Sequence, residues 1–164
     1  MIRKCTLLFN IFLFQVFGLF AQENSKIDSL NRLLEQSTRS DSIEILLLVG
    51  EEYYLDENYP KALNIFFTSL KLSESLNNST RAADAANDIG RIYYEIENYS
   101  EALKYYNRAL DYFIIDKNEQ KQGGVYNNIA LIYYETDSLD QAVKYYNDAL
   151  KIYEKYGNEL ELAT

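Results

Sequence analysis

Histidine and tryptophan are absent from the 164-residue chain, and cysteine and proline each occur once. Without histidine, the sequence has no His-based catalytic triad and no His/Cys zinc site. The single cysteine, Cys5, lies near the N-terminus, so the rest of the chain has neither a thiol nucleophile nor a disulfide. These absences argue against an enzyme, and we expect no cofactor and no bound metal.

Positive charge is also scarce, because 16 Lys and Arg residues oppose 25 Asp and Glu residues and leave a net charge of -9. A surface that binds nucleic acid needs an excess of Lys and Arg to neutralise phosphates. We therefore exclude nucleic acid as a partner of this chain. Apolar residues make up 48% of the sequence, which suffices for a packed core, and the length suits one domain or one array of repeats.

Residues 1–21 have the layout of a secretory signal peptide. Arg3 and Lys4 precede an apolar run that ends near Phe20, and the small residue Ala21 stands before a polar stretch. The run is about sixteen residues long, which is shorter than the ~20 needed to span a bilayer. We predict an exported protein, periplasmic or secreted, that meets a membrane only through this segment or through an anchor beyond the given sequence. An uncleaved N-terminal anchor is the alternative.

The rest of the sequence repeats with a period of forty residues. Self-similarity at a fixed period is typical of repeat architectures. Three units share a small residue, two tyrosines, an alanine and a leucine in the same register: Gly50, Gly90 and Ala130; Tyr53, Tyr93 and Tyr133; Tyr54, Tyr94 and Tyr134; Ala62, Ala102 and Ala142; Leu70, Leu110 and Leu150. The chain is therefore predicted to be an array of three similar units.

Each unit is predicted to contain two helices, because apolar residues recur at helical spacing on both sides of a polar break. Asn98 stands three residues before Glu101, the spacing of a capping box, and Ser138 has the same spacing to a glutamine. Asn58 is the expected cap in the first unit. Pro60 follows it in the first helical turn, where the missing N–H costs nothing.

Small residues are expected where the two helices of a unit meet. We predict that Gly50, Gly90 and Ala130 face the second-helix alanines Ala62, Ala102 and Ala142. The aromatic residues Phe66, Tyr106 and Tyr146 then fill the space toward the next unit. One such hairpin cannot bury its apolar face alone, so stacked hairpins share a continuous core. The predicted fold class is an all-α, right-handed solenoid of antiparallel helix hairpins.

This pattern resembles the tetratricopeptide repeat family. The family motif has a small residue, a tyrosine, an alanine, an aromatic residue and a second alanine, and Gly90, Tyr93, Ala102, Tyr106 and Ala109 match it in that order. The resemblance covers about residues 43–162. The units are longer than the family's usual repeat, and we expect the extra residues to lengthen the second helix and the connection after it.

The predicted domain organisation follows from this register. Residues 26–36 look like an unpaired second helix in which Leu30, Leu33 and Leu34 form the apolar stripe, and we interpret them as a cap. The sequence then stops at the start of a fourth repeat, so we expect a fragment of a longer protein, with a short natural chain as the alternative. The segments are 1–21 signal peptide, 22–42 capping helix and linker, 43–82, 83–122 and 123–162 repeats, and 163–164 the start of the fourth.

The resemblance implies a concave groove lined by the first helix of each repeat. Tyrosine and asparagine at its groove-facing positions suit a peptide, because they combine a rigid aromatic body with groups that pair with a peptide backbone. The alternative is that the tyrosine rings only pack between repeats. The candidate peptide-binding residues are Tyr54, Asn87, Arg91, Tyr94, Glu95, Asn127, Asn128, Tyr134 and Glu135.

The charge of these positions narrows the expected partner to a neutral or basic protein or peptide segment. One subclass of the family grips a C-terminal carboxylate with Lys and Arg in the groove, but here Glu51 and Asp88 occupy such positions and only Arg91 is basic. An acidic or neutral groove favours an uncharged or basic ligand. The exported repeats resemble the N-terminal part of bacterial sensor histidine kinases and helix-turn-helix regulators. We therefore predict a non-catalytic sensory module, with a stand-alone assembly scaffold as the alternative.

Overall fold

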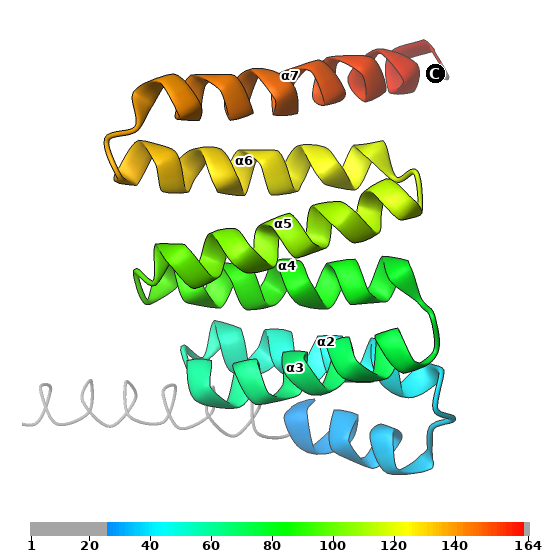
Figure 1. Ribbon diagram of the computed structural model, residues 1–164. Helices are drawn as coiled ribbons and strands as arrows, with labels where there is room; N and C mark the ends of the chain where they lie inside the picture. Colours follow the sequence, from blue (N-terminus) through cyan, green and yellow to red (C-terminus); the bar gives the residue numbers. More distant parts are fainter. Residues whose placement is uncertain (1–25, 163–164) are drawn as a thin grey trace, which may run out of the picture.

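The computed structural model describes residues 26–162, with side chains described as far as Gly157. The predicted signal segment, 1–21, and the start of a fourth repeat, 163–164, lie outside the described residues. A short helix covers residues 26–36 and is followed by six longer helices stacked in one direction (Figure 1). These are α2 (Asp41–Leu55), α3 (Tyr59–Ser75), α4 (Ser79–Glu95), α5 (Tyr99–Ile115), α6 (Glu119–Glu135) and α7 (Leu139–Leu162).

The stack is curved, and its inner side is formed by α2, α4 and α6. Each helix packs against the next one along the chain. In addition, α2 contacts α4 and α4 contacts α6, whereas no such contact joins α3 to α5 or α5 to α7. Because the first helices of successive hairpins lie closer together than the second helices, the first helices line the concave face. The predicted all-α solenoid of antiparallel hairpins is thus confirmed.

The same three-residue turn ends each of the first five labelled helices. Its middle residue has a positive φ of 53–58°, and its backbone closes the helix with the paired bonds of a Schellman motif. After α4, for example, Glu97 N donates to Tyr94 O (2.9 Å) and Asn98 N donates to Tyr93 O (2.8 Å). The middle residues are Glu57, Asn77, Glu97, Lys117 and Asp137.

These turns correct the prediction of a lengthened connection between repeats. The connection after a second helix is as short as the turn inside a hairpin, and both helices of the middle repeat have 17 residues. The extra residues therefore extend both helices and not the connection. The expected boundaries at 83 and 123 lie inside α4 and α6, which begin at Ser79 and Glu119.

Asparagine caps begin three of the helices. The Asn78, Asn98 and Asn118 side chains accept bonds from backbone N–H groups three residues further on, at 3.1, 3.4 and 3.3 Å. The predicted capping box at Asn98 is therefore half formed, because the Glu101 carboxylate accepts a bond from Lys104 Nζ (2.9 Å) instead of returning to the cap. In the first repeat, Asn58 occupies the cap position without a side-chain bond and Pro60 lies in the first turn as expected.

Ser138 does not form the capping box that its spacing to a glutamine predicts. Its hydroxyl donates to Thr136 O at 3.4 Å, back into the turn. The backbone carbonyl of Ser138, and not its side chain, accepts from Gln141 N at 3.0 Å. A serine side chain is shorter than that of asparagine, and here its hydroxyl bonds within the turn and does not cap the helix.

Gly50 and Gly90 in the first helices make room for aromatic rings. A Cβ atom added to Gly90 would lie 2.6 Å from the ring of Tyr106, and one added to Gly50 would lie 2.4 Å from the ring of Phe66. Both rings are buried, with 2% and 0% exposure. The prediction that these aromatics fill space toward the next unit is therefore corrected: each ring lies across the glycine of its own repeat.

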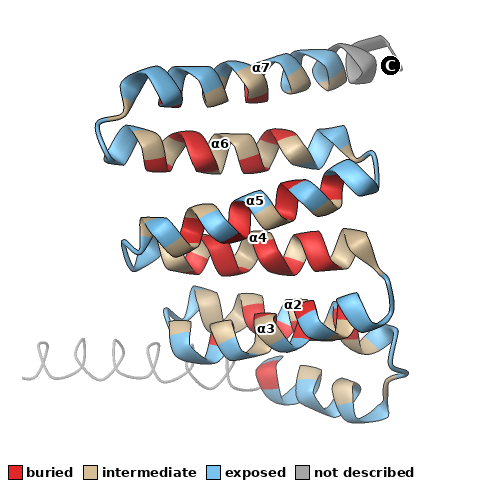
Figure 2. Cartoon of the chain, viewed as in Figure 1, coloured by how far each residue is buried: buried red, intermediate tan, exposed pale blue. Residues whose placement is uncertain are grey.

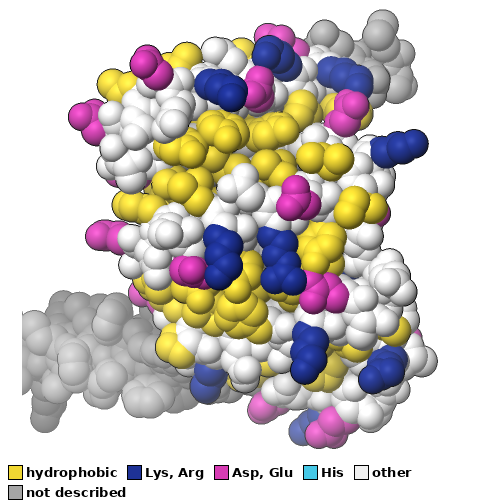
Figure 3. Space-filling view, viewed as in Figure 1, with side chains coloured by type: hydrophobic (Ala, Val, Ile, Leu, Met, Phe, Trp, Pro, Cys, Tyr) yellow, Lys and Arg dark blue, Asp and Glu magenta, His cyan; other side chains and the backbone are white. Residues whose placement is uncertain are grey.

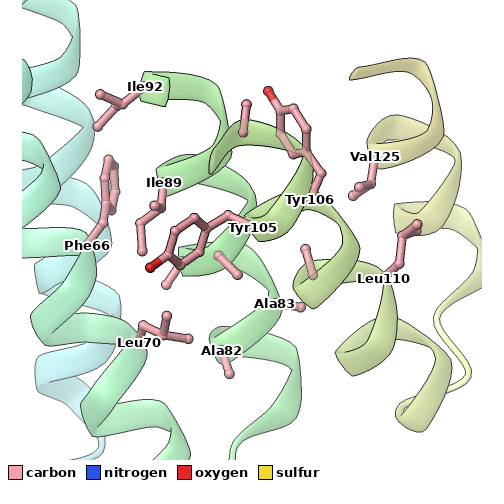
Figure 4. Packing of buried hydrophobic residues seen from close by; sticks show 14 of the residues in the cluster. Phe66, Leu70, Ala82, Ala83, Ile89, Ile92, Tyr105, Tyr106, Leu110 and Val125 are labelled. Atoms are coloured by element: carbon pink, nitrogen blue, oxygen red, sulfur yellow. The ribbon is translucent and has the colours of Figure 1, made fainter. Parts of the chain in front are cut away.

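Burial is greatest in the middle of the stack and lower at both ends, in the helix at 26–36 and in α7 (Figure 2). The buried cluster joins α3, α4, α5 and α6 and includes Phe66, Ile89 and Val125 (Figure 4). At the N-terminal end, Ile27 is buried, Leu30 and Leu34 are half-buried, and Leu33 is 54% exposed. The expected apolar stripe of the helix at 26–36 therefore excludes Leu33. In the part of the chain that the structure covers, no helix is long and apolar enough to cross a membrane.

Candidate functional site

Two cavities open along the concave helices and contain most of the residues predicted to bind a peptide. The larger cavity, of about 480 Å³, lies between α4 and α6 and reaches α5 and α7. The smaller, of about 150 Å³, lies between α2, α4 and α6. Arg91 and Asn128 line both cavities, so the two form one continuous site. The predicted residues in the larger cavity are Asn87, Arg91, Asn127 and Asn128; those in the smaller are Tyr54, Arg91, Tyr94, Glu95 and Asn128.

Amide side chains dominate the larger cavity. Asn128 Nδ2 donates to Asn87 Oδ1 at 3.2 Å, which ties α6 to α4. Asn127 is half-buried and has no hydrogen bond within the described residues. An amide offers two donors and one acceptor carbonyl, so Asn127 presents its full capacity to whatever enters. Phe113 and Tyr153 supply apolar walls.

Arg91 is the central charged group of the site. Its guanidinium donates to Glu51 on α2 (3.2 Å) and to Asp88 one turn earlier on α4 (3.0 Å). It also lies over the ring of Tyr54, 4.3 Å from the centroid. These contacts fix the guanidinium and neutralise it, because two carboxylates share one cation.

Asp88 responds to its position beneath the groove. The pKa of Asp88 is raised to about 7, mainly by burial; Arg91 opposes this rise, and the nearby Glu51 and Asp84 contribute to it. The Asp88 side chain is 19% exposed. A carboxylate in a desolvated site favours its neutral form. The charge of the groove floor therefore changes near neutral pH.

The smaller cavity is built from tyrosines. Tyr54 O–H donates to Glu95 Oε1 at 3.1 Å, across the boundary between the first two repeats. Tyr54 also contacts Tyr59, and Tyr94 contacts Tyr99, with ring centroids 6.0 and 5.9 Å apart. Tyr54 thus joins adjacent repeats, as the packing alternative predicts, and still lines the cavity with Tyr94.

Two predicted residues lie outside both cavities. Tyr134, which is 59% exposed, and its neighbour Glu135 lie at the C-terminal end of α6. Of the three equivalent tyrosines predicted to bind a peptide, Tyr54 and Tyr94 therefore line the cavity and Tyr134 does not. The third ring has no following repeat among the described residues to pack against.

Several residues that line the site are not among those predicted, and they include Phe113 and Tyr106 on α5, Tyr153 on α7, and Lys121 on α6. Lys121 Nζ lies 2.5 Å from Asp84 Oδ1. Three of these residues belong to second helices, which the repeat register assigns to the outer layer. The sequence shows that these three second-helix residues are aromatic, but only the packing of the helices shows that their side chains reach the groove.

The described residues contain no group of three or more His, Cys, Asp or Glu side chains placed to hold a metal ion. The carboxylates of the site are instead paired with cations or with a tyrosine hydroxyl. The arrangement provides hydrogen-bonding amides, aromatic walls and fixed charges, which are the parts of a binding surface.

Comparison with known proteins agrees with this architecture. Two family models, both described as tetratricopeptide repeat, match residues 41–114 and 87–156. No curated protein matches the sequence. Among solved structures, BtubC (BKLC) from P. vanneervenii is similar, with 25% identity and a TM-score of 0.72 over 86% of this chain and 58% of that chain. The chain thus spans little more than half of BtubC.

Two further structures show the same fold at lower identity. The TPR domain of Arabidopsis FLU has 24% identity and a TM-score of 0.67 over 72% of this chain and 99% of that one. A Rap protein complexed with competence and sporulation factor has 19% identity and a TM-score of 0.74 over 86% of this chain and 41% of that one. With the two family models together covering residues 41–156, the chain belongs to the tetratricopeptide repeat family.

Proposed function

We propose that this protein is a non-catalytic module that binds an extended peptide segment of a partner along its concave face. The observation that carries the proposal is the continuous site across α2, α4 and α6, in which the Asn127 amide has no partner among the described residues. A half-buried amide beside a cavity is suited to pair with the backbone N–H and C=O groups of an extended chain.

The net charge of the groove supports a neutral or basic ligand. Arg91 is shared by Glu51 and Asp88, and Lys121 is paired with Asp84, so neither cation is free to attract an acidic segment. Two Rap proteins of the same fold have been solved with bound factors, one with competence and sporulation factor and one with a Phr* peptide. Their identities to this chain are 19% and 15%, so they support the fold's capacity to hold a peptide and not a particular ligand.

The test is a selection of displayed seven-residue peptides on the folded chain, followed by titration of synthetic winners. We expect Asn127→Ala to weaken binding by roughly fivefold to tenfold, because the peptide backbone loses its hydrogen bonds to one amide. Asn107→Ala is the matched control, since Asn107 is exposed on the second-helix layer at α5 and bonds only to Leu103 O (2.8 Å). Equal binding by wild type and Asn127→Ala would refute a peptide groove at this site.

We further propose that the module is exported and forms the sensory part of a bacterial signalling protein. The basic and apolar layout of residues 1–21 supports export. Expression with the native N-terminus tests it: mass spectrometry should find a mature chain that begins at Gln22, whereas a full-length chain would favour the anchor alternative.

The gene sequence beyond Thr164 separates a sensor from a scaffold. A sensor predicts an apolar stretch of ~20 residues with basic flanks, followed by an output domain. A stop codon after further repeats would favour the stand-alone assembly scaffold. Both alternatives use the same groove.

A further inference from the structure

Tyr106 carries a hydroxyl that the packing of the repeat does not need. The residue is 2% exposed, and its hydroxyl has no hydrogen bond among the described residues. Phe66 takes the corresponding place in the first repeat, lies across Gly50 as Tyr106 lies across Gly90, and has no hydroxyl. Among the buried side-chain oxygens of the described residues, those without a partner belong to Ser69 and Ser73. The Tyr106 hydroxyl is therefore open to the cavity that the residue lines, where a ligand can reach it.

The smaller cavity is the place where this hydroxyl can find a partner. Tyr106 lines it together with Tyr54, Tyr94 and Glu95. In Figure 4 the hydroxyls of Tyr106 and its neighbour Tyr105 point in different directions. The ring of Tyr105 stacks on the ring of Tyr93, with 5.6 Å between the centroids. Gly90 makes the placement possible, because a side chain there would occupy the position of the Tyr106 ring.

The groups around the cavity are mainly acceptors and aromatic faces. Glu95 forms no ion pair among the described residues and accepts only the Tyr54 hydroxyl. Asn128 has already used an N–H on Asn87, so its carbonyl remains available. Arg91 is held by Glu51 and Asp88. The unpaired charge at this cavity is therefore negative, and it is bordered by tyrosine rings that favour a cation.

We propose that this cavity receives the side chain of a lysine or arginine from the bound peptide. Glu95 supplies the counter-charge, and the Tyr106 hydroxyl and the Asn128 carbonyl accept hydrogen bonds from the ammonium or guanidinium. The apolar side chain of Leu131 borders the same cavity and contacts the aliphatic stem. The volume, about 150 Å³, corresponds to about five water molecules at ~30 Å³ each, which is enough for one long side chain.

This inference rests on the proposed peptide groove, and it specifies the kind of peptide residue that the groove prefers. Peptides selected on wild type should share a lysine or arginine at one position. Replacing that residue with norleucine, when it is a lysine, should weaken binding to wild type by roughly tenfold, as loss of charge-assisted hydrogen bonds does. The same replacement should matter little to Tyr106→Phe and Glu95→Gln, which have lost the acceptors.

Tyr105→Phe is the matched control, because it removes a neighbouring hydroxyl that does not line the cavity. It should keep the full preference for the basic residue. Tyr106→Phe should fold as well as wild type, since Phe66 already serves in the equivalent place, and circular dichroism checks this.

The outcomes separate the two proposals. Peptides that depend on Asn127 but share no basic residue would overturn the cation pocket and leave the groove standing. If the selected peptides shared an acidic residue instead, the cation pocket would be refuted, and Arg91 would be the residue that binds the peptide's carboxylate. A preference for lysine that persists in Tyr106→Phe and Glu95→Gln would also overturn the cation pocket. Failure to select any peptide that depends on Asn127 would overturn both proposals.

Discussion

Single residues decide how closely the two helices of a repeat approach. Gly90 and Gly124 both lie inside helices of the concave layer, but their surroundings differ. A Cβ at Gly90 would overlap the buried Tyr106 ring at 2.6 Å, whereas one at Gly124 would meet only the Tyr153 hydroxyl at 3.9 Å. Glycine is thus required at one position by packing and is free to vary at the other.

We predict that Gly90→Ala lowers the free energy of unfolding by about 1–3 kcal/mol, the usual cost of overpacking a core. Gly124→Ala should raise it by about 0.5–1 kcal/mol, because alanine favours a helix more than glycine does. Urea denaturation of the two variants and wild type measures both changes. Two shifts of the same sign would contradict the assignment of Gly90 to a ring contact.

The ionisation of Asp88 should also appear in stability. Its pKa is about 7 in the folded chain, against an ordinary value of 3.8, so between about pH 4 and 7 the folded state holds a proton that the unfolded state has lost. Stability therefore falls as pH rises through this window and levels off above it. We expect a contribution of roughly 2–4 kcal/mol from this residue, given about 1.4 kcal/mol per pKa unit.

The comparison between wild type and Asp88→Asn isolates this contribution. The variant cannot ionise, so its stability should change less with pH between 4 and 7. Asp111→Asn, at an exposed position on α5, is the control and should follow wild type. Parallel stability curves for wild type and Asp88→Asn would show that Asp88 does not titrate in this range.

At the scale of an element, the turns and not the helices carry the strain. Each of the five turns places a residue other than glycine in the left-handed region, at φ of 53–58°, which costs about 1–2 kcal/mol relative to glycine. The favourable bonds of the Schellman motif and the following asparagine cap offset this cost at α4, α5 and α6.

We therefore predict that Lys117→Gly, in the turn between α5 and α6, stabilises the chain by about 0.5–1 kcal/mol. Asp116→Gly is the comparison one residue earlier, where φ is -79°, so glycine relieves no strain. It adds disorder to the unfolded chain and removes the hydrogen bond that Asp116 Oδ2 accepts from Thr80 Oγ1. It should destabilise by a similar amount. Thermal unfolding followed by circular dichroism distinguishes the two, and stabilisation by both would argue against a strained turn.

The helices and their order could be predicted from the sequence because the forty-residue period fixes their register. The turn geometry could not, since Glu97 and Lys117 give no sign of a positive φ. The groove was partly predictable: Asn87, Arg91 and Asn128 were found from the repeat positions. Tyr106 and Phe113 were missed because they reach the groove only if α4 and α5 pack closely. Gly90 permits this close packing, but a glycine in the sequence does not by itself predict it.

Over the described residues, the molecule is stabilised by contacts between neighbours: each labelled helix packs against the helices adjacent to it along the chain, and α4 also contacts the first helices α2 and α6. Its outermost described helix keeps a large apolar surface: Val143, Leu150 and Tyr153 on α7 are 58%, 51% and 48% exposed. Hydrophobic side chains also show as separate patches, divided by Lys and Arg, on the face seen in Figure 3. Stability is therefore expected to decrease from the centre toward α7.

Hydrogen exchange of the given chain should show this gradient. Amides of α4 and α5, whose apolar residues are buried on both sides, should exchange about tenfold to a hundredfold more slowly than those of α7, as expected for units of unequal local stability. Mass spectrometry of peptic fragments resolves the helices. Equal protection from α2 to α7 would indicate a single cooperative unit in place of an array.

The common turn sets a rule for how such an array can change length. Because the turn after each helix from α2 to α6 is the same, a deletion of twenty residues within this part would join two helices through the same turn. However, it would exchange inner and outer layers for everything downstream, and residues such as Asn127 would face the wrong side. Gains or losses in steps of forty residues keep Asn127 and its equivalents on the concave face, so we expect the array to change length by whole hairpins.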